Sequence, residues 1–89
     1  MKISEGKKNK ISEQILSTLF YENPKSLFTS QIAKEIVRDE EFTKSLLKGL
    51  KSKDLLSEIK KNKEGVPYLK RSRWKLSEKA YSLYKASQN

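Results

Sequence analysis

The sequence predicts one small α+β domain, mainly helical, whose elements follow the order α-β-α-α-β-β-α. Apolar residues recur every three or four positions in four separate stretches, which is the period of an amphipathic helix. Between the third and fourth of these stretches the apolar period becomes two, which is typical of paired strands. The chain has 89 residues, enough for one hydrophobic core and too few for two.

The N-terminal residues 1–10 carry four Lys and one Glu and show no apolar period. They are predicted to form a basic flexible arm in front of a folded domain over residues 11–88. The first helix is predicted from Ile11 onward, because apolar residues recur every four positions from there to Leu19. Asn23-Pro24 ends it, since proline disfavours helical geometry in the residue before it.

A short β-compatible segment, Leu27-Phe28, precedes the second helix, and Thr29 or Ser30 offers a hydroxyl to cap that helix. Its apolar face is predicted to consist of Ile32, Ala33, Ile36 and Val37.

The third helix opens on three acidic residues from Asp39 onward, which suit the positive end of the helix dipole. It ends at Lys53-Asp54, with Asp54 where a left-handed backbone is often needed. Its buried stripe is predicted to be Phe42, Leu46, Leu47 and Leu50.

Two strands are predicted over residues 57–61 and 68–76, joined by a turn that contains Asn, Gly and Pro. Trp74 alternates with Arg71 and Arg73, so the indole is expected to face the core and both arginines to face away together. We predict that Ser77 caps the last helix, whose apolar face consists of Ala80, Tyr81, Leu83 and Tyr84.

The composition excludes several classes of function. The chain has no Cys and no His, which removes disulfides, thiolate nucleophiles, imidazole catalysis and nearly every transition-metal site. No apolar run approaches the length of a membrane span, and no signal-peptide apolar region is present. No nucleophile, base and oxyanion site can be assembled. We therefore expect a cytoplasmic protein that is not an enzyme, with no cofactor, no membrane contact and no small-molecule ligand.

The positive charge is concentrated in one part of the chain. The formal net charge is +9, and residues 44–75 alone carry +8 from eleven basic and three acidic residues. Residues 11–43 carry −3. Ordinary solubilising charge is scattered evenly, so this concentration indicates a surface that faces a polyanion.

Three stretches, FTSQIA (28–33), LLKGLKSKDLL (46–56) and WKLSEKA (74–80), together resemble winged helix-turn-helix domains. The resemblance extends over about residues 11–87 and is to small prokaryotic and archaeal regulators of the MarR, PadR and ArsR type. It implies that the chain binds double-stranded DNA as a transcriptional regulator, probes the major groove with its third helix and touches the backbone or minor groove with a basic wing. With that function we expect a homodimer associated with the nucleoid, because a palindromic site needs a two-fold protein.

The sequence departs from these families at three places. Asp54 and Ala80 stand where such proteins have glycine, after the third helix and after the wing respectively. The acidic residues 39–41 lie near the point where these families turn a helix N-terminus toward DNA. Because acids repel phosphate, we expect the docking to tilt toward Lys44, Lys48 and the wing.

The candidate DNA contacts fall into three groups. They are Ser30 and Gln31 at the second helix, Thr43, Lys44, Ser45, Lys48 and Lys51 on the third helix, and Lys60, Lys61, Lys63, Lys70, Arg71 and Arg73 on the wing. Thr43, Ser45 and Lys48 are expected to read base edges, and the other cations to hold phosphate. Each group also has a structural explanation: helix capping, a solvated helix face, and an edge hairpin charged against aggregation.

The last helix carries more apolar surface than it needs to dock. Two interpretations are open for Tyr81, Leu83 and Tyr84: they pack within the chain, or they form a dimer face. Trp74, Phe28 and Phe42 are predicted to be core residues. A second hypothesis for the whole chain is a winged helix that binds proteins within a transcription, replication or ribosomal complex, with the acidic first half and the last helix as partner faces.

Overall fold

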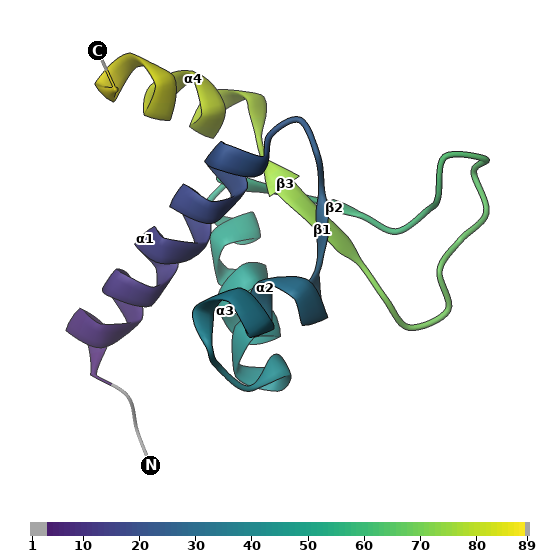
Figure 1. Cartoon of the computed structure of the whole chain (residues 1–89), viewed down its shortest axis with the longest axis horizontal. Coiled ribbons are helices and arrows are strands. Elements are labelled where there is room, and N and C mark those ends of the chain that lie inside the picture. The colour runs from purple at the N-terminus through teal and green to yellow at the C-terminus, as the bar shows by residue number, and fades with distance from the viewer. Residues whose placement is uncertain (1–3, 89) are drawn as a thin grey trace.

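A computed structural model describes residues 4–88. In chain order the elements are α1 (Glu5–Glu22), β1 (Leu27–Phe28), α2 (Thr29–Ile36), α3 (Glu40–Ser52), β2 (Leu56–Ile59), β3 (Arg73–Leu76) and α4 (Glu78–Ser87). This is the predicted order, and the arrangement is a winged helix. Helices α1, α2 and α3 gather beside the sheet, while the β2–β3 hairpin, the wing, extends away from the body (Figure 1).

The sheet has three antiparallel strands in the order β1-β3-β2, so β3 is the central strand. In the register, Trp74 of β3 lies opposite Leu27 of β1 on one side and Glu58 of β2 on the other. Leu76 lies opposite Leu56, which brings two buried leucines together at the inner end of the hairpin.

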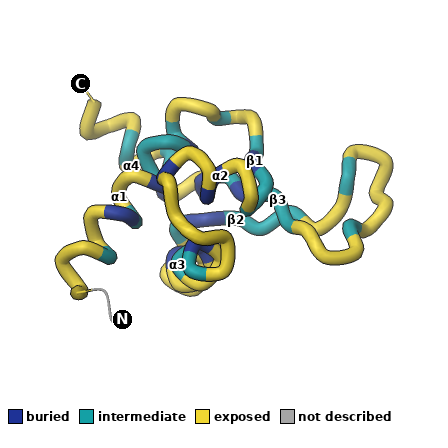
Figure 2. The backbone as a smooth tube through the Cα atoms, turned by 60° about the horizontal axis from the view of Figure 1, so that its bottom comes forward, coloured by how far each residue is buried: buried dark blue, intermediate teal, exposed yellow. Residues whose placement is uncertain are grey.

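The hydrophobic core lies between the sheet and the three N-terminal helices, and the wing is exposed along most of its length (Figure 2). Ile15, Leu19, Ile32 and Leu47 are fully buried, as is Trp74. The predicted stripes of the four helices supply most of this core: Ile11, Ile15, Leu19, Ile32, Ala33, Ile36, Leu47, Leu50 and Ala80.

The start of α2 differs from the prediction that Thr29 or Ser30 caps it. Phe28 is the N-cap residue, and its backbone N–H donates to Gln31 Oε1 at 2.8 Å. Thr29 has another partner, because its Oγ1 accepts from Trp74 Nε1 at 2.8 Å. The threonine hydroxyl therefore satisfies the buried indole and not the helix end.

The predicted flexible arm over residues 1–10 is wrong for its second half, since α1 already begins at Glu5. Ser4 caps the helix by accepting from the backbone N–H of Lys7 at 3.3 Å, and Glu5 lies in the first turn. Lys and Glu are good helix formers, so the helix extends outward from the turns that Ile11 anchors in the core. Residues 1–3 lie outside the described residues.

Val37 was predicted to lie on the apolar face of α2, but it is 84% exposed. It is the C-cap residue, with left-handed backbone at φ 55° and ψ 52°, and the N–H of Arg38 donates to Ala33 O at 3.0 Å across it. The left-handed backbone at Val37 reverses the chain direction in the short turn into α3, and it directs the valine side chain outward. Asp54, after α3, has φ 64°, so its predicted left-handed conformation is confirmed.

Both strands are shorter than the predicted ranges 57–61 and 68–76. Ile59 pairs with Arg73, but the next bridge joins Lys61 to Pro67. Residues 68–72 therefore face a single residue of the other strand, and they bulge out of the ladder. Pro67 has no N–H, so it can only accept a hydrogen bond in its bridge to Lys61. Asn62 closes the tip, where its Oδ1 accepts from the N–H groups of Glu64 and Val66, each at 2.9 Å.

Val37→Gly is expected to raise the free energy of unfolding by roughly 0.5–1 kcal/mol. Left-handed backbone costs a β-branched residue about 1–2 kcal/mol, which glycine avoids. The greater conformational entropy of glycine in the unfolded chain offsets part of this stabilisation. Urea denaturation at neutral pH measures the change. Val37→Ala keeps the Cβ atom and serves as the control with little gain; a glycine variant no more stable than the wild type would contradict the prediction.

Candidate nucleic-acid interface

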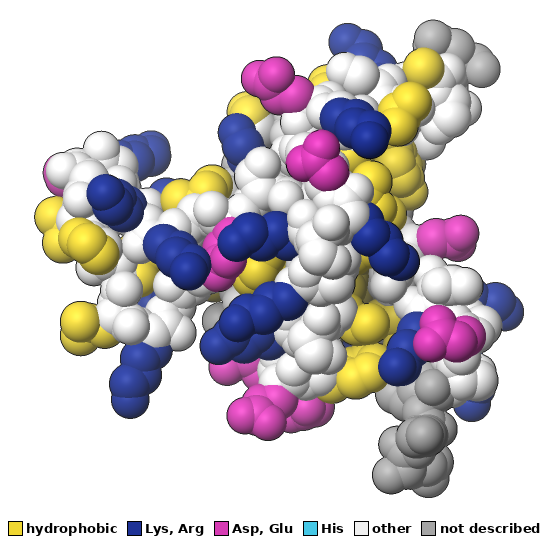
Figure 3. All heavy atoms as spheres, turned by 180° about the vertical axis from the view of Figure 1, so that it is seen from behind, with side chains coloured by type: hydrophobic (Ala, Val, Ile, Leu, Met, Phe, Trp, Pro, Cys, Tyr) yellow, Lys and Arg dark blue, Asp and Glu magenta, His cyan; other side chains and the backbone are white. Residues whose placement is uncertain are grey.

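The solvent side of α3 presents a short stripe of basic and hydroxyl side chains. Asp39 begins the helix by accepting from the N–H of Phe42 at 2.9 Å, and Leu47 and Leu50 hold the opposite side in the core. Lys44, Ser45, Lys48 and Lys51 remain exposed. Viewed from behind, the molecule shows Lys and Arg side chains spread over the middle of the body and along the wing (Figure 3).

Thr43 does not belong to this exposed stripe. The residue is fully buried, and its Oγ1 donates to Asp39 O at 2.8 Å. It follows the same helical spacing as the buried Leu47 and Leu50, four and seven positions further on. The prediction that Thr43 reads base edges is therefore wrong, and Ser45 is the hydroxyl residue that α3 exposes. The Ser45 hydroxyl donates to Phe42 O at 2.9 Å, which leaves its oxygen lone pairs to accept.

A carboxylate that sequence reasoning missed joins α3 to the base of the wing. The Glu58 side chain is only 6% exposed; its Oε1 lies 2.8 Å from Lys51 Nζ, and its Oε2 accepts from Ser72 Oγ at 2.6 Å. Burial opposes ionisation of Glu58, but the hydrogen bonds from Lys51 and Ser72 and the charges of Lys51 and Lys60 outweigh it and lower the pKa. Lys51 is thus bound within the protein, and its charge is largely compensated.

The two wing arginines have different surroundings, although both guanidinium groups lie 5.7 Å from the centre of the same Tyr68 ring. Arg71 is exposed, with its guanidinium stacked 4.6 Å from the centre of the Phe28 ring. Arg73 is half-buried in β3, where its Nη2 donates to Lys61 O at 3.4 Å and its Cζ lies 5.7 Å from the Tyr68 ring. Arg71 can reach a ligand, whereas Arg73 braces the wing.

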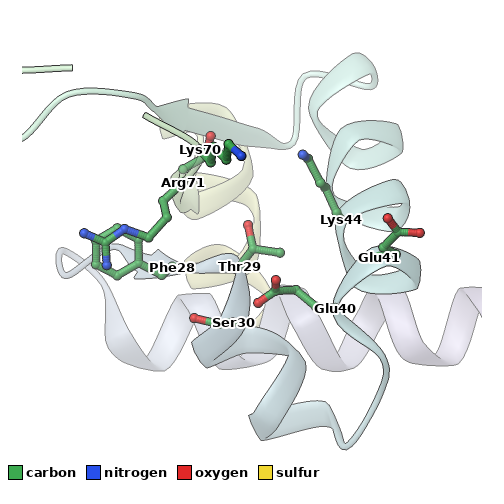
Figure 4. A pocket seen from close by; sticks show the side chains of 9 residues that line it. Phe28, Thr29, Ser30, Glu40, Glu41, Lys44, Lys70 and Arg71 are labelled. Carbon is green, nitrogen blue, oxygen red and sulfur yellow. The ribbon is translucent and has the colours of Figure 1, made fainter. Parts of the chain in front are cut away.

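A shallow pocket of about 270 Å³ lies where the start of α2, the start of α3 and the inner wing meet. Ser30 lines it from α2, Lys44 and Glu40 from α3, and Lys70 and Arg71 from the wing (Figure 4). Three cations and one hydroxyl residue that were predicted to contact DNA therefore line the same pocket, although Glu40 and Glu41 on its edge reduce the positive charge there.

Gln31 lies apart from this group. Its side chain lines a different hollow, between α1 and α2, and its Oε1 is occupied by the N–H of Phe28. Lys60 joins the interface from the other side, because a third hollow, of about 350 Å³ between α3 and β2, is lined by Lys48, Lys51, Ser52, Glu58 and Lys60. Lys61 and Lys63 lie further out on the exposed part of the wing.

The last helix divides its apolar residues between two surroundings. Tyr81 and Tyr84 stack on Phe20 of α1, with ring centres 5.4 and 5.0 Å apart. Leu83, by contrast, is 61% exposed. The packing interpretation thus accounts for the two tyrosines, and Leu83 has no such partner in the core cluster.

Two negative findings apply to residues 4–88. None of their helices has the length and apolar character needed to cross a membrane. Within the same range, no three carboxylate, thiol or imidazole side chains are grouped so that they could hold a metal ion.

No protein-family profile and no curated protein sequence matches the chain. Solved structures do match it. MepR of Staphylococcus aureus, in a complex with DNA, aligns with 88% of this chain at a TM-score of 0.74 and 20% identity. ZitR of Lactococcus lactis aligns with 99% at 0.70 and 19% identity. A putative DNA-binding protein of Ralstonia eutropha aligns with 99% at 0.65 and 16% identity.

These likenesses confirm the winged-helix fold that the sequence resemblance implied. The chain spans 60% of the MepR chain and 56% of the ZitR chain, but the whole of the Ralstonia protein. The shared part is thus the helix-turn-helix with its wing, and the basic face described above is the candidate site on it.

Glu58→Gln is expected to lower the free energy of unfolding by about 1 kcal/mol at pH 7, because the half-exposed Lys51 loses its charged partner. The pKa of Glu58 is lowered in the folded chain, so its contribution is complete above the unfolded pKa of about 4.3 and disappears as the pH falls through the folded value. Urea denaturation of the wild type and of Glu58→Gln at pH 7 and pH 3 measures the difference.

The difference between wild type and Glu58→Gln should shrink at pH 3. Glu64→Gln, which changes an exposed carboxylate at the wing turn, is the control and should alter stability little at either pH. A difference between Glu58→Gln and wild type that is as large at pH 3 as at pH 7 would show that the ion pair is not its source.

Proposed function

We propose that this chain binds double-stranded DNA and acts as a transcriptional regulator, with α3 in the major groove and the wing on the backbone or minor groove. The observation that carries the proposal is that the exposed lysines of α3 and the cations of the wing lie on one face of a winged helix. MepR, which has the same fold, is a transcription regulator of a multidrug efflux pump and has been crystallised with DNA.

The binding energy would come mainly from phosphate contacts. Lys44 and Lys48 on α3 and Lys60, Lys61 and Lys70 on the wing would displace the counterions that surround DNA. Arg71 would add a planar donor set suited to phosphate. The role of direct base reading on α3 falls to Ser45, since Thr43 is buried and Lys48 is assigned to phosphate.

The acidic residues at the start of α3 set the docking angle in this proposal. Asp39 is occupied as the helix cap, whereas Glu40 and Glu41 are exposed at the edge of the pocket. Two carboxylates repel the phosphate backbone, so the N-terminus of α3 would stay away from it and the middle of the helix, with Lys44 and Lys48, would lie closest to DNA.

The regulator would act as a homodimer in the nucleoid of the cytoplasm. A two-fold protein matches the two half-sites of a palindromic DNA sequence. Leu83, with its exposed apolar side chain on α4, would lie at the centre of the dimer face, and Tyr81 and Tyr84 would border it. The proposal assigns no reaction, cofactor or small-molecule ligand to the chain.

Wild-type protein should shift a random-sequence duplex in a gel at low salt and lose affinity steeply as salt rises. Lys48→Ala should weaken binding to every sequence and reduce the slope of log affinity against log salt by about one unit. Ser45→Ala should change sequence preference and leave that slope unchanged. Lys79→Ala, which removes an exposed lysine from α4, is the charge-matched control.

If the wild type fails to bind duplex DNA at low salt, the proposal is wrong, and the second hypothesis, a winged helix that binds protein partners, takes its place. If Lys79→Ala lowers the salt slope as much as Lys48→Ala does, the contact surface is not the face formed by α3 and the wing.

Leu83→Glu should convert the proposed dimer to a monomer, because two buried glutamates would face each other across the two-fold axis. Sedimentation velocity over a range of micromolar concentrations measures the change. Ser82→Glu, which adds the same charge at the neighbouring exposed position, is the control. A wild-type protein that sediments as a monomer at high micromolar concentration would contradict the dimer.

A further inference from the structure

The outer part of the wing carries an apolar group that the proposed phosphate contacts do not use. Leu69 is 100% exposed and Val66 is 56% exposed. Pro67 between them is also exposed. Figure 3 shows hydrophobic side chains at the far end of the wing, next to Lys and Arg side chains. Single exposed apolar residues are common on proteins, but here three of them, called the wing patch below, lie within four positions at a projecting end of the molecule.

The bulge in the hairpin holds Leu69 away from the body. On one side of it, the N–H of Tyr68 donates to Lys60 O at 2.8 Å. On the other side, the guanidinium of Arg71 stacks on the Phe28 ring, which also meets the Tyr68 ring edge-on at 5.4 Å. Both neighbouring parts of the loop are thus attached to the protein, while Leu69 itself is left in solvent.

The tip is ordered without any contribution from its apolar side chains. Asn62 fixes it through four hydrogen bonds: its Oδ1 accepts from the N–H groups of Glu64 and Val66, its own N–H donates to Val66 O at 3.0 Å, and its carbonyl accepts from the N–H of Gly65 at 3.0 Å. A preorganised loop loses little conformational entropy on binding. An exposed apolar group on such a loop is available for a partner and is not needed for folding.

The charge around these apolar side chains indicates what kind of partner they would bind. Lys61, Lys63 and Lys70 are exposed on the same loop, so the apolar side chains of the wing patch lie among cations. Duplex DNA offers the complementary arrangement, with apolar base faces between two rows of phosphate. A patch of three side chains is too small for the apolar centre of a stable protein interface, which takes about 20–30 residues from each partner.

We propose that Leu69, supported by Val66 and Pro67, inserts into the minor groove as an apolar wedge between base pairs and bends the duplex. This inference rests on the proposed DNA binding and adds a second source of specificity to it. Apolar wedges of this kind kink DNA by about 20–90°, and pyrimidine–purine steps kink most readily. The wing would then select sites by how easily they deform, without hydrogen bonds to the bases.

The test is the apparent persistence length of a long mixed-sequence duplex, followed by the motion of a tethered particle. Saturating wild-type protein should reduce it to roughly half of the bare-DNA value of about 50 nm. Leu69→Gln keeps nearly the same volume without the apolar character and should leave the bare-DNA value unchanged. Leu69→Phe should bend DNA as the wild type does. Because position 69 is fully exposed, all three proteins should melt alike.

The outcomes separate the wedge from DNA binding itself. Leu69→Gln should still shift the duplex in a gel with the wild-type salt slope, because its cations are intact. If it also bends DNA like the wild type, or if the wild type binds without bending, the wedge is refuted while the proposed function stands. If the wild type shifts no duplex at low salt, the proposed function fails as well. Wild-type binding to phosphatidylserine vesicles but not to duplex, lost in Leu69→Gln, would assign the patch to a lipid surface instead.

Discussion

The burial of Trp74 is the constraint on which the rest of the structure depends. The indole is fully buried in the central strand, and its Nε1 donates to Thr29 Oγ1 at 2.8 Å. A buried N–H without an acceptor would cost about 1–3 kcal/mol, so this bond fixes the first residue of α2 against the middle of the sheet. Because α2 leads into α3 and β3 leads out of the wing, the contact sets how the proposed recognition helix and the wing lie relative to each other.

The pair of Glu58 and Lys51 is a second link between the same two parts, and it takes a cation away from the interface. Glu58 is a nearly buried carboxylate in a chain of net charge +9, and it bonds to Lys51 of α3 and to Ser72 in front of β3. A lysine held in this way gives up much of its attraction for phosphate. The protein thus uses one of the α3 lysines for orientation and leaves Lys44 and Lys48 for a ligand.

Sequence periodicity was sufficient for the order of elements and most of the core, because each stripe reports which side of a helix is buried. The same spacing predicts that Thr43 is buried, because it shares the stripe of Leu47 and Leu50. Its hydroxyl suggested a surface position instead. Glu58 gave no such signal. Its partners lie 7 and 14 positions away in sequence, so only the folded register brings them together. The bulge before Arg73 was hidden for the same reason, since alternation in the sequence continues through residues that lie outside the regular ladder.

The composition of the interface bears on how it could recognise DNA. The chain has seventeen Lys and three Arg, and lysine attracts phosphate as a point charge with little geometric selectivity. Thr43 is buried, Gln31 is bonded to the start of its own helix, and the Ser45 hydroxyl already donates to Phe42 O. Few groups are therefore left to read base edges directly. A surface of this kind would supply affinity readily and base-specific hydrogen bonds poorly, so in the proposed complex most discrimination between DNA sites would come from the shape and deformability of the duplex.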